Sequence, residues 1–262
     1  MNKALLVVSF GTSAPGVAER TIGAVERALA QAMPERAFYS CWTSRVICAK
    51  VERETGVHHM QLAEALDAMA TAGVSDVLVQ PTHLMQGREN RVMLETLREH
   101  AGDFDRICLG NTLLTCDDDC TALARAICSA FAEMRGGDAL VLMGHGSAFG
   151  GNEAFSRMQQ AFGRVGRDDV VVATVEGEPS FADALAFVET RKPSRIWLAP
   201  LMMVAGDHAQ NDMAGSDPDS WASQLAARGY EVLPVLRGLG EYPEVQSLFV
   251  KHAQCAYPLE QA

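Results

Sequence analysis

The 262-residue sequence has little positive charge and no long apolar run. Its 22 lysines and arginines are outnumbered by 33 aspartates and glutamates, which gives a formal net charge of −11. This charge argues against general binding to nucleic acids or membrane surfaces, which require basic patches. No apolar stretch approaches the ~20 residues of a membrane-spanning helix, and residues 4–10 are too short for the core of a signal peptide. These absences predict a cytoplasmic protein without a nucleic-acid or membrane partner.

The cysteines lack the spacing of a redox or zinc motif. There are seven, and no two stand as C-x-x-C. An odd count in a long chain predicts free thiols in a reducing compartment. Cys116 and Cys120 flank three aspartates, which is one way to hold a metal ion. A capped helix start followed by a thiol that faces the core is the better interpretation.

What the sequence does contain is the alternation typical of parallel α/β proteins. Short apolar runs alternate with helical periodicity, including predicted helices at 89–100, 121–134 and 242–256. A Gly-Gly hinge at 136–137 predicts two α/β domains, residues 1–135 and 136–262, each with a parallel sheet flanked by helices. The predicted strands are 4–9, 37–42, 76–79, 106–109, 139–143, 170–175, 196–199 and 231–235.

The two halves repeat each other in three blocks that occur in the same order. Residues 4–12 match 139–147, residues 79–89 match 198–208, and residues 107–120 run beside 232–245. Strands of α/β proteins resemble one another, so chance similarity is an alternative to duplication. The proline and glycine positions that the two halves share weaken this alternative. The sequence therefore predicts one α/β unit present in two copies.

Two histidines stand at the ends of predicted strands in the second half. His145 lies between two glycines after the strand at 139–143, and His208 follows the strand at 196–199. Ligands of open parallel sheets bind beyond the carboxyl ends of the strands. We therefore expect these imidazoles to share one site with Glu176, which follows the intervening strand. Two imidazoles and one carboxylate suit a divalent first-row metal and leave positions open for a substrate.

The first half differs at the corresponding positions. Phe10 stands where the second half has His145, and Glu89 stands where it has His208. The duplication is therefore predicted to be asymmetric, with a metal site in one half and an aromatic face and a carboxylate in the other. His83, just after the third strand, fits either a site-lining or a packed residue.

Basic residues also gather after the second and third predicted strands. Arg45 precedes Lys50 and Arg53, and Arg88 and Arg91 surround the glutamate at position 89. Such a patch in an acidic protein fits a ligand rich in carboxylates. Solvated helix surface is the simpler explanation for Lys50 and Arg53.

Three segments of the sequence resemble the anaerobic sirohydrochlorin cobaltochelatases of cobalamin biosynthesis, and the similarity extends over nearly the whole chain. They are Leu-Leu-Val-Val-Ser-Phe-Gly-Thr-Ser at 5–13, Met-Gly-His-Gly at 143–146 and, most specifically, Pro-Leu-Met-Met-Val-Ala-Gly-Asp-His-Ala-Gln-Asn-Asp-Met-Ala at 200–214. The resemblance implies two similar α/β domains facing each other across a cleft, the class II chelatase arrangement. It also implies an enzyme of the lyase class that inserts Co²⁺ into sirohydrochlorin without ATP.

The resemblance also implies roles for individual residues. Its metal ligands fall on His145, Glu176 and His208, and its cleft glutamate falls on Glu89. We expect His145 to accept a pyrrole proton, assisted by Glu89, because an imidazole near neutrality suits that task. The residues expected to contact the tetrapyrrole are Phe10, Thr12, Arg45 and Arg88.

The sequence departs from the family pattern in two places. Arg88 replaces a residue that is often acidic or histidine, and residues 147–151 differ. The contacts to the edge of the substrate therefore stay open. No bound haem is expected, because the signal peptide and nearby histidine of haem-binding relatives are missing.

Three rival functions share the same features. A sirohydrochlorin ferrochelatase would use the same ligands for Fe²⁺, since affinity order does not select cobalt over iron. A non-catalytic carrier of metal or tetrapyrrole would use the same site without a base. A two-domain sugar- or phosphate-binding protein would share the duplicated architecture alone. The physiological metal and the oligomeric state, including a homo-oligomer, stay open.

Overall fold

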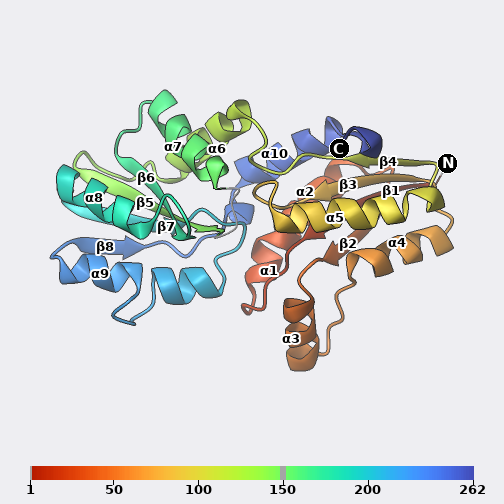
Figure 1. Ribbon diagram of the computed structural model, residues 1–262, viewed down its shortest axis with the longest axis horizontal. Coiled ribbons are helices and arrows are strands. Elements are labelled where there is room, and N and C mark those ends of the chain that lie inside the picture. The colour runs from red at the N-terminus through yellow and green to blue at the C-terminus, as the bar shows by residue number, and fades with distance from the viewer. Residues whose placement is uncertain (1, 148–151) are drawn as a thin grey trace. The chain divides into compact units, whose positions relative to one another are not determined.

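The computed structural model describes residues 2–147 and 152–262, which form two compact α/β units (Figure 1). Unit 1 comprises Met1–Thr115 and Pro243–Ala262, and unit 2 comprises Cys116–Tyr242. Most of the segment that departs from the family pattern, residues 148–151, lies outside the described residues. Among the helices described, none is long and apolar enough to cross a membrane.

Unit 1 is built on a five-stranded sheet in the order β2-β1-β3-β4-β9. The strands are β1 (Lys3–Ser9), β2 (Ala37–Trp42), β3 (Asp76–Pro81), β4 (Arg106–Leu109) and β9 (Tyr257–Pro258). The first four are parallel, and only β9 is antiparallel to its neighbour. The central strands are apolar on both faces, as expected where helices cover a parallel sheet from both sides.

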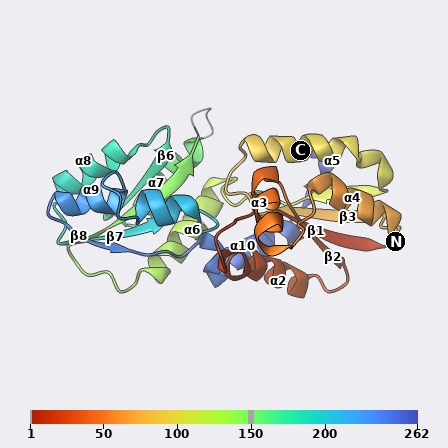
Figure 2. The ribbon, with the colours of Figure 1, turned by 90° about the horizontal axis from the view of Figure 1, so that it is seen from below.

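Helices cover both faces of this sheet (Figure 2). Leu66 and Met93, from α4 and α5, belong to the core on one face, and α2 packs with α10 against the other. Helix α3 projects from the unit (Figure 1), and its only buried residue is Cys48. The helices are α1 (Val17–Arg20), α2 (Ile22–Ala32), α3 (Arg45–Thr55), α4 (Leu62–Thr71), α5 (Arg88–Glu99), η1 (Ala101–Asp103), α10 (Pro243–Gln254) and η4 (Leu259–Gln261).

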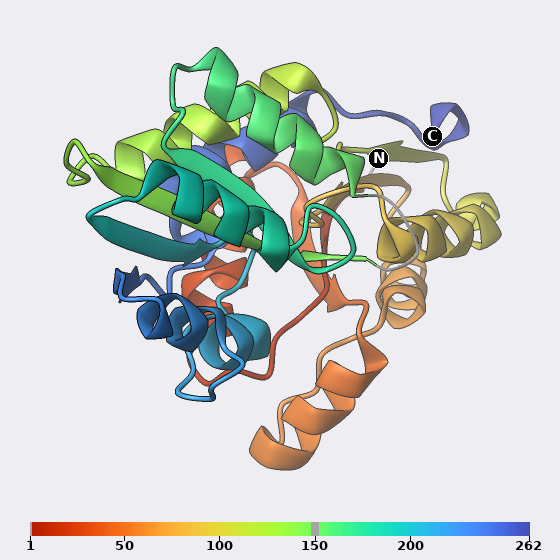
Figure 3. The ribbon, with the colours of Figure 1, turned by 60° about the vertical axis from the view of Figure 1, so that its left-hand side comes forward.

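Unit 2 is built on a four-stranded, fully parallel sheet in the order β6-β5-β7-β8. The strands are β5 (Asp138–Gly146), β6 (Val170–Glu176), β7 (Arg195–Pro200) and β8 (Glu231–Pro234). Helix α7 lies on one side of the sheet and α9 on the other (Figure 3). The helices are α6 (Asp117–Ala130), α7 (Glu153–Arg164), α8 (Phe181–Arg191), the π-helical turn η2 (Ala209–Met213), α9 (Trp221–Ala227) and η3 (Leu239–Glu241).

The strand registers confirm the predicted repeat. Val8 of β1 pairs with Pro81 of β3, and the matching Met143 of β5 pairs with Pro200 of β7. The amide that follows each proline donates to the carbonyl group of the proline's register partner, Val8 in unit 1 and Met143 in unit 2, at 2.8 Å in both units. The strand order is also shared, because β2-β1-β3-β4 corresponds to β6-β5-β7-β8.

The division between the units differs from the expected boundary at residues 135 and 136. Helix α6 was expected in the first domain, but it packs on α7 in unit 2. Helix α10 and β9 were expected in the second domain, but they belong to unit 1. The Gly-Gly segment is a turn inside unit 2, where Gly137 has φ 98° and the Asp138 amide donates to Arg135.

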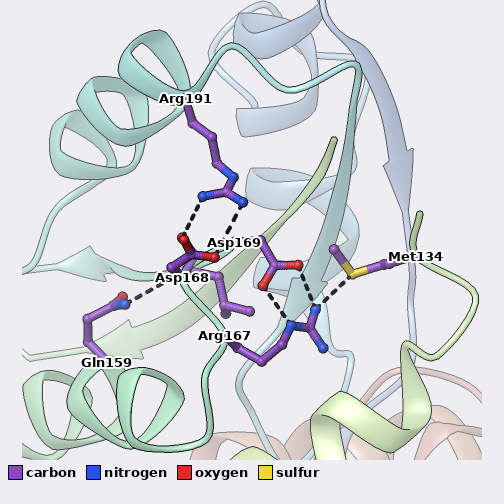
Figure 4. Close-up of polar contacts among 7 residues, drawn as sticks. Met134, Gln159, Arg167, Asp168, Asp169 and Arg191 are labelled. Carbon is purple, nitrogen blue, oxygen red and sulfur yellow. Dashed lines mark hydrogen bonds and ion pairs between the residues drawn. The ribbon is translucent and has the colours of Figure 1, made fainter. Parts of the chain in front are cut away.

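The turn that leads into β6 is clamped by two arginine–aspartate pairs (Figure 4). Arg167 donates to both carboxylate oxygens of Asp169, at 2.6 and 3.0 Å. Arg191 of α8 donates to the backbone carbonyl of Asp168 at 2.9 Å. Gln159 of α7 donates to the Val170 carbonyl at 3.0 Å. These contacts fix the start of the strand whose far end carries a predicted metal ligand.

Candidate metal centre

The glycines on either side of His145 are required by their surroundings. A Cβ atom on Gly144 would lie 2.3 Å from the ring of Phe155 in α7. Gly146 has φ 74°, and a Cβ atom there would lie 2.0 Å from the backbone carbonyl oxygen of Glu176. The backbone of β5 is therefore held tightly on both sides of His145, which is itself exposed at the carboxyl end of the strand.

His208 is presented by a segment whose backbone is anchored on two neighbours. After β7, the Leu201 amide donates to Met143, and the carbonyl group of Met202 accepts from the Leu239 amide, both at 2.8 Å. Gly238 lies against the same segment, because its Cβ atom would stand 2.6 Å from the Met203 carbonyl oxygen. His208 follows this segment as the N-terminal cap of η2.

The structure brings the two predicted histidines together within unit 2. The ring centroids of His145 and His208 are 4.6 Å apart, and the ring planes are nearly perpendicular at 88°. The Nδ1 atom of His145 lies 2.9 Å from the Gly146 carbonyl oxygen, and the Nδ1 atom of His208 lies 2.5 Å from a carboxylate oxygen of Asp212. Because both partners are acceptors, each Nδ1 carries the proton and each Nε2 keeps a lone pair for a metal ion.

Glu176 lies at the end of β6, as expected, but its side chain is not part of the histidine pair. Its register partner is Gly146, the residue that follows His145 in β5. Its backbone carbonyl group is fixed by Asn152 and Thr174 at 3.0 and 3.1 Å. Within residues 2–147 and 152–262, no three His, Cys, Asp or Glu side chains are placed to hold an ion together.

In unit 1, Phe10 is 46% exposed, but the backbone next to it is held in place by Trp42. Gly11 has φ 96°, and a Cβ atom on it would lie 2.7 Å from the indole of Trp42. His59 stacks on Trp42 with ring centroids 3.5 Å apart, so its imidazole packs against the indole. Thr12 is buried, and its hydroxyl accepts from the Ala14 amide at 3.2 Å. The hydroxyl of Thr12 therefore stabilises the turn.

Three other predicted residues stand at the starts of helices in unit 1. Arg45 and Arg88 are the first residues of α3 and α5, and both are exposed. Glu89 is half-buried in the first turn of α5, where the helix dipole favours a negative charge. These side chains are available for a ligand at the helix starts.

Of the two interpretations of His83, a residue that lines the site or a residue packed in the core, the structure shows the second. Its side chain is 8% exposed, and neither ring nitrogen has a hydrogen-bond partner among the described residues. Burial lowers the pKa of His83 to about 4, so the imidazole is neutral. By the repeat, His83 stands where unit 2 has Met202, and the backbone carbonyl groups of His83 and Met202 accept hydrogen bonds from the amides of Leu113 and Leu239.

The His208–Asp212 contact is a feature that the sequence reasoning missed. A histidine followed four residues later by an aspartate is a readable signal, because such residues face each other on a helical turn. The other cluster of interest, Cys116 with its aspartates, is a helix start as expected. Asp117 is the first residue of α6, and the thiol of Cys120 is fully buried.

Comparison with known proteins agrees with this architecture. The fold of unit 1 and unit 2 is shared with a Bacillus subtilis structure, SirB with Fe³⁺, at 13% identity and a TM-score of 0.70, covering 97% of this chain and 95% of that one. It is also shared with CbiX, a terminal enzyme of sirohaem biosynthesis in denitrifying bacteria, at 20% identity and a TM-score of 0.55, covering 97% and 99%.

Sequence relatives are closer than these structures. The chain is 34% identical to the sirohydrochlorin cobaltochelatase of Salmonella typhimurium over 96% of this chain and 95% of that protein. It is 32% identical to the sirohydrochlorin cobaltochelatase CbiKC of Nitratidesulfovibrio vulgaris over 74% and 69%. The sequence model of the cobalt chelatase (CbiK) family matches residues 3–257. With this match spanning nearly all of both units, the chain belongs to the cobalt chelatase (CbiK) family.

Proposed function

We propose that this protein inserts Co²⁺ into sirohydrochlorin, without ATP, as a step of anaerobic cobalamin biosynthesis. The observation that carries the proposal is the imidazole pair of His145 and His208. Both Nδ1 atoms donate hydrogen bonds, and both Nε2 atoms keep a lone pair that can bind a metal ion. The activity named for relatives that match almost the whole chain supports the same reaction.

An incomplete ligand set suits this chemistry. Insertion requires that the protein first bind the ion and then release it to four ring nitrogens, so a closed site would retain the metal. Two neutral imidazoles bind a divalent ion while leaving positions for the macrocycle. Glu176 is proposed to join as a third ligand by swinging its exposed carboxylate from the end of β6.

The reaction must also remove two protons from the pyrrole nitrogens. We assign the first transfer to Nε2 of His145, because its Nδ1 proton is already committed to the Gly146 carbonyl oxygen. Nε2 of His145 releases the ion before it accepts this proton, so the metal then remains on His208, and the second proton passes to solvent. Glu89 is proposed to assist, and Phe10, Arg45 and Arg88 are proposed to contact the ring and its carboxylates. Thr12 is proposed to shape the turn beside Phe10.

The test follows sirohydrochlorin absorbance after Co²⁺ is added in the absence of ATP. Wild-type protein accelerates the spectral change, and His145→Ala and His208→Ala abolish the acceleration. His58→Ala is the matched control, because His58 is an exposed imidazole whose ion-pair partners in the described part of the chain are Glu52 and Glu64. Near-normal turnover by both site variants contradicts the assignment.

Two rivals are separated by the same assay. A ferrochelatase inserts Fe²⁺ faster than Co²⁺, so initial rates with Co²⁺, Fe²⁺ and Ni²⁺ decide the metal. A carrier binds metal or tetrapyrrole but leaves the insertion rate at its uncatalysed value. Glu89→Gln, assayed in parallel, loses turnover if the carboxylate assists. The cytoplasmic location, the absence of haem and the oligomeric state stay predictions.

A further inference from the structure

The two imidazoles of the pair are held by chemically different groups. His145 donates from Nδ1 to a neutral backbone carbonyl group, that of its own neighbour Gly146. His208 donates from Nδ1 to the carboxylate of Asp212. A carboxylate acceptor withdraws the Nδ1 proton more strongly than a carbonyl does, and this makes the opposite nitrogen a stronger electron donor. The two potential ligands are therefore unequal.

The carboxylate of Asp212 is positioned by the backbone of η2. Asp212 lies four residues after His208, on a turn widened by a hydrogen bond from the Ala214 amide to the Ala209 carbonyl oxygen. The residues that directly follow His208 and Asp212, Ala209 and Met213, are fully buried in the core of unit 2. The turn cannot rotate without exposing them, so the direction from Asp212 to His208 is fixed.

Asp207 provides an internal comparison. It is the immediate neighbour of His208, it carries the same charge and it is exposed. No hydrogen bond or ion pair joins its side chain to a residue in the described part of the chain. The two aspartates therefore differ in contact with the imidazole while contributing similar charge to the surroundings.

We propose that Asp212 is a positioning residue that commits His208 to coordination through Nε2 and makes His208 the ligand that retains the ion. His145, held within residues 2–147 and 152–262 only by a carbonyl group, is then the ligand that exchanges with the substrate. This inference rests on the proposed function, because it assigns an order to ligands of the same site.

A simpler role for the contact is to stabilise the turn. An exposed pair at this spacing contributes little to stability, and both side chains are close to half exposed, at 43% and 47%. A structural role would change thermal unfolding and leave metal affinity in the folded protein unchanged. The two roles are separated by measuring both quantities.

The experiment titrates the full chain with Co²⁺ alone and follows the visible absorption of the bound ion. We expect Asp212→Asn to weaken Co²⁺ binding by about 10–100-fold and to alter the absorption bands, while Asp207→Asn stays within about twofold. Asp212→Glu restores part of the affinity. His208→Ala loses more affinity than His145→Ala, because His208 is the retaining ligand.

Three outcomes overturn the inference: no measurable Co²⁺ binding by wild-type protein, wild-type affinity in Asp212→Asn, or an equal loss in Asp207→Asn. Failure of the proposed function has a different signature. In that case wild-type protein binds Co²⁺ with the expected dependence on Asp212 but does not accelerate insertion into sirohydrochlorin.

Discussion

A Cβ atom on Gly146 would stand 2.0 Å from the backbone carbonyl oxygen of Glu176, so the end of β5 and the end of β6 are in direct backbone contact. The contact joins the residue beside one predicted metal ligand to the backbone of another. It explains why a glycine follows His145: no side chain fits, and φ of 74° is a conformation that other residues rarely adopt.

Gly146→Ala therefore lowers both stability and activity. The loss of unfolding free energy is expected to exceed the ~1 kcal/mol typical of alanine in this conformation, because the steric overlap adds to it. Gly56→Ala is the matched control, since Gly56 has the same φ of 74° and nothing within 4 Å of its Cβ position. Urea unfolding of both variants compares the two costs. Equal losses would show that the contact with Glu176 relaxes freely.

Phe10→Ala tests the aromatic face predicted for unit 1. Because the side chain is 46% exposed, its removal should change the unfolding free energy by no more than about 0.5 kcal/mol. The KM for sirohydrochlorin should rise by about tenfold if the ring stacks on the macrocycle, an interaction of roughly 1–1.5 kcal/mol. Phe38→Ala is the control, at 41% exposure on β2. A rise in KM shared by both variants would rule out a specific contact.

His83→Met should stabilise the protein at low pH. The buried imidazole has its pKa lowered to about 4 from 6.5, so the unfolded chain binds the proton more tightly than the folded protein does. Stability is therefore complete above pH 6.5 and falls as the pH decreases towards 4. Methionine, the residue that the repeat has at position 202, does not titrate. Urea unfolding at pH 7.5 and 5 should show that the unfolding free energy of the variant depends less on pH than that of wild-type protein. The same pH dependence in both proteins would contradict the lowered pKa of His83.

Asp138→Asn should remove an acid-sensitive contribution to stability. Burial raises the pKa of Asp138, but hydrogen bonds from Arg195, the Arg135 amide and Trp197 outweigh it and lower the pKa to about 2. The ionised form therefore stabilises the fold above the unfolded pKa of 3.8, and this contribution is lost as the pH falls towards 2. At pH 7 the variant should lose about 2–3 kcal/mol, which corresponds to a pKa difference of just under two units.

The check on this prediction is the pH dependence of the difference. Unfolding free energies of wild-type protein and Asp138→Asn should converge as the pH decreases from 5 to 3. Glu133→Gln is the control, because Glu133 is exposed and its carboxylate has no hydrogen bond or ion pair with another described residue. A difference that is constant with pH would assign the loss to packing rather than to charge.

Much of the fold could be predicted from the sequence because the buried strands are short apolar runs with sharp ends. The strands 37–42 and 106–109 were predicted with the bounds of β2 and β4. Helix α7 was not predicted, although it is strongly amphipathic, with Phe155 and Phe162 buried on one face. Strand β9 has only two residues, and its pairing with β4 depends on a long-range contact that no local pattern encodes.

The candidate site was predictable to the same extent. Strand-end placement identifies His145 and His208 as neighbours, because both follow strands that pair with each other. The same reasoning places Glu176 at the end of β6, beside the end of β5, but strand-end placement does not give the direction of its side chain. The partner of His208 depends on the π-helical turn, which widens a local helix by one residue.

The return of α10 and β9 to the first sheet has a consequence for the order in which the protein can fold. Unit 2 is a continuous segment, so all of its strands have been synthesised before the last helix of unit 1 exists. Unit 1 needs the end of the chain to cover one face of its sheet and to complete its edge. During synthesis, the half with the histidine pair can therefore reach its native core first, while the half that starts the chain finishes last.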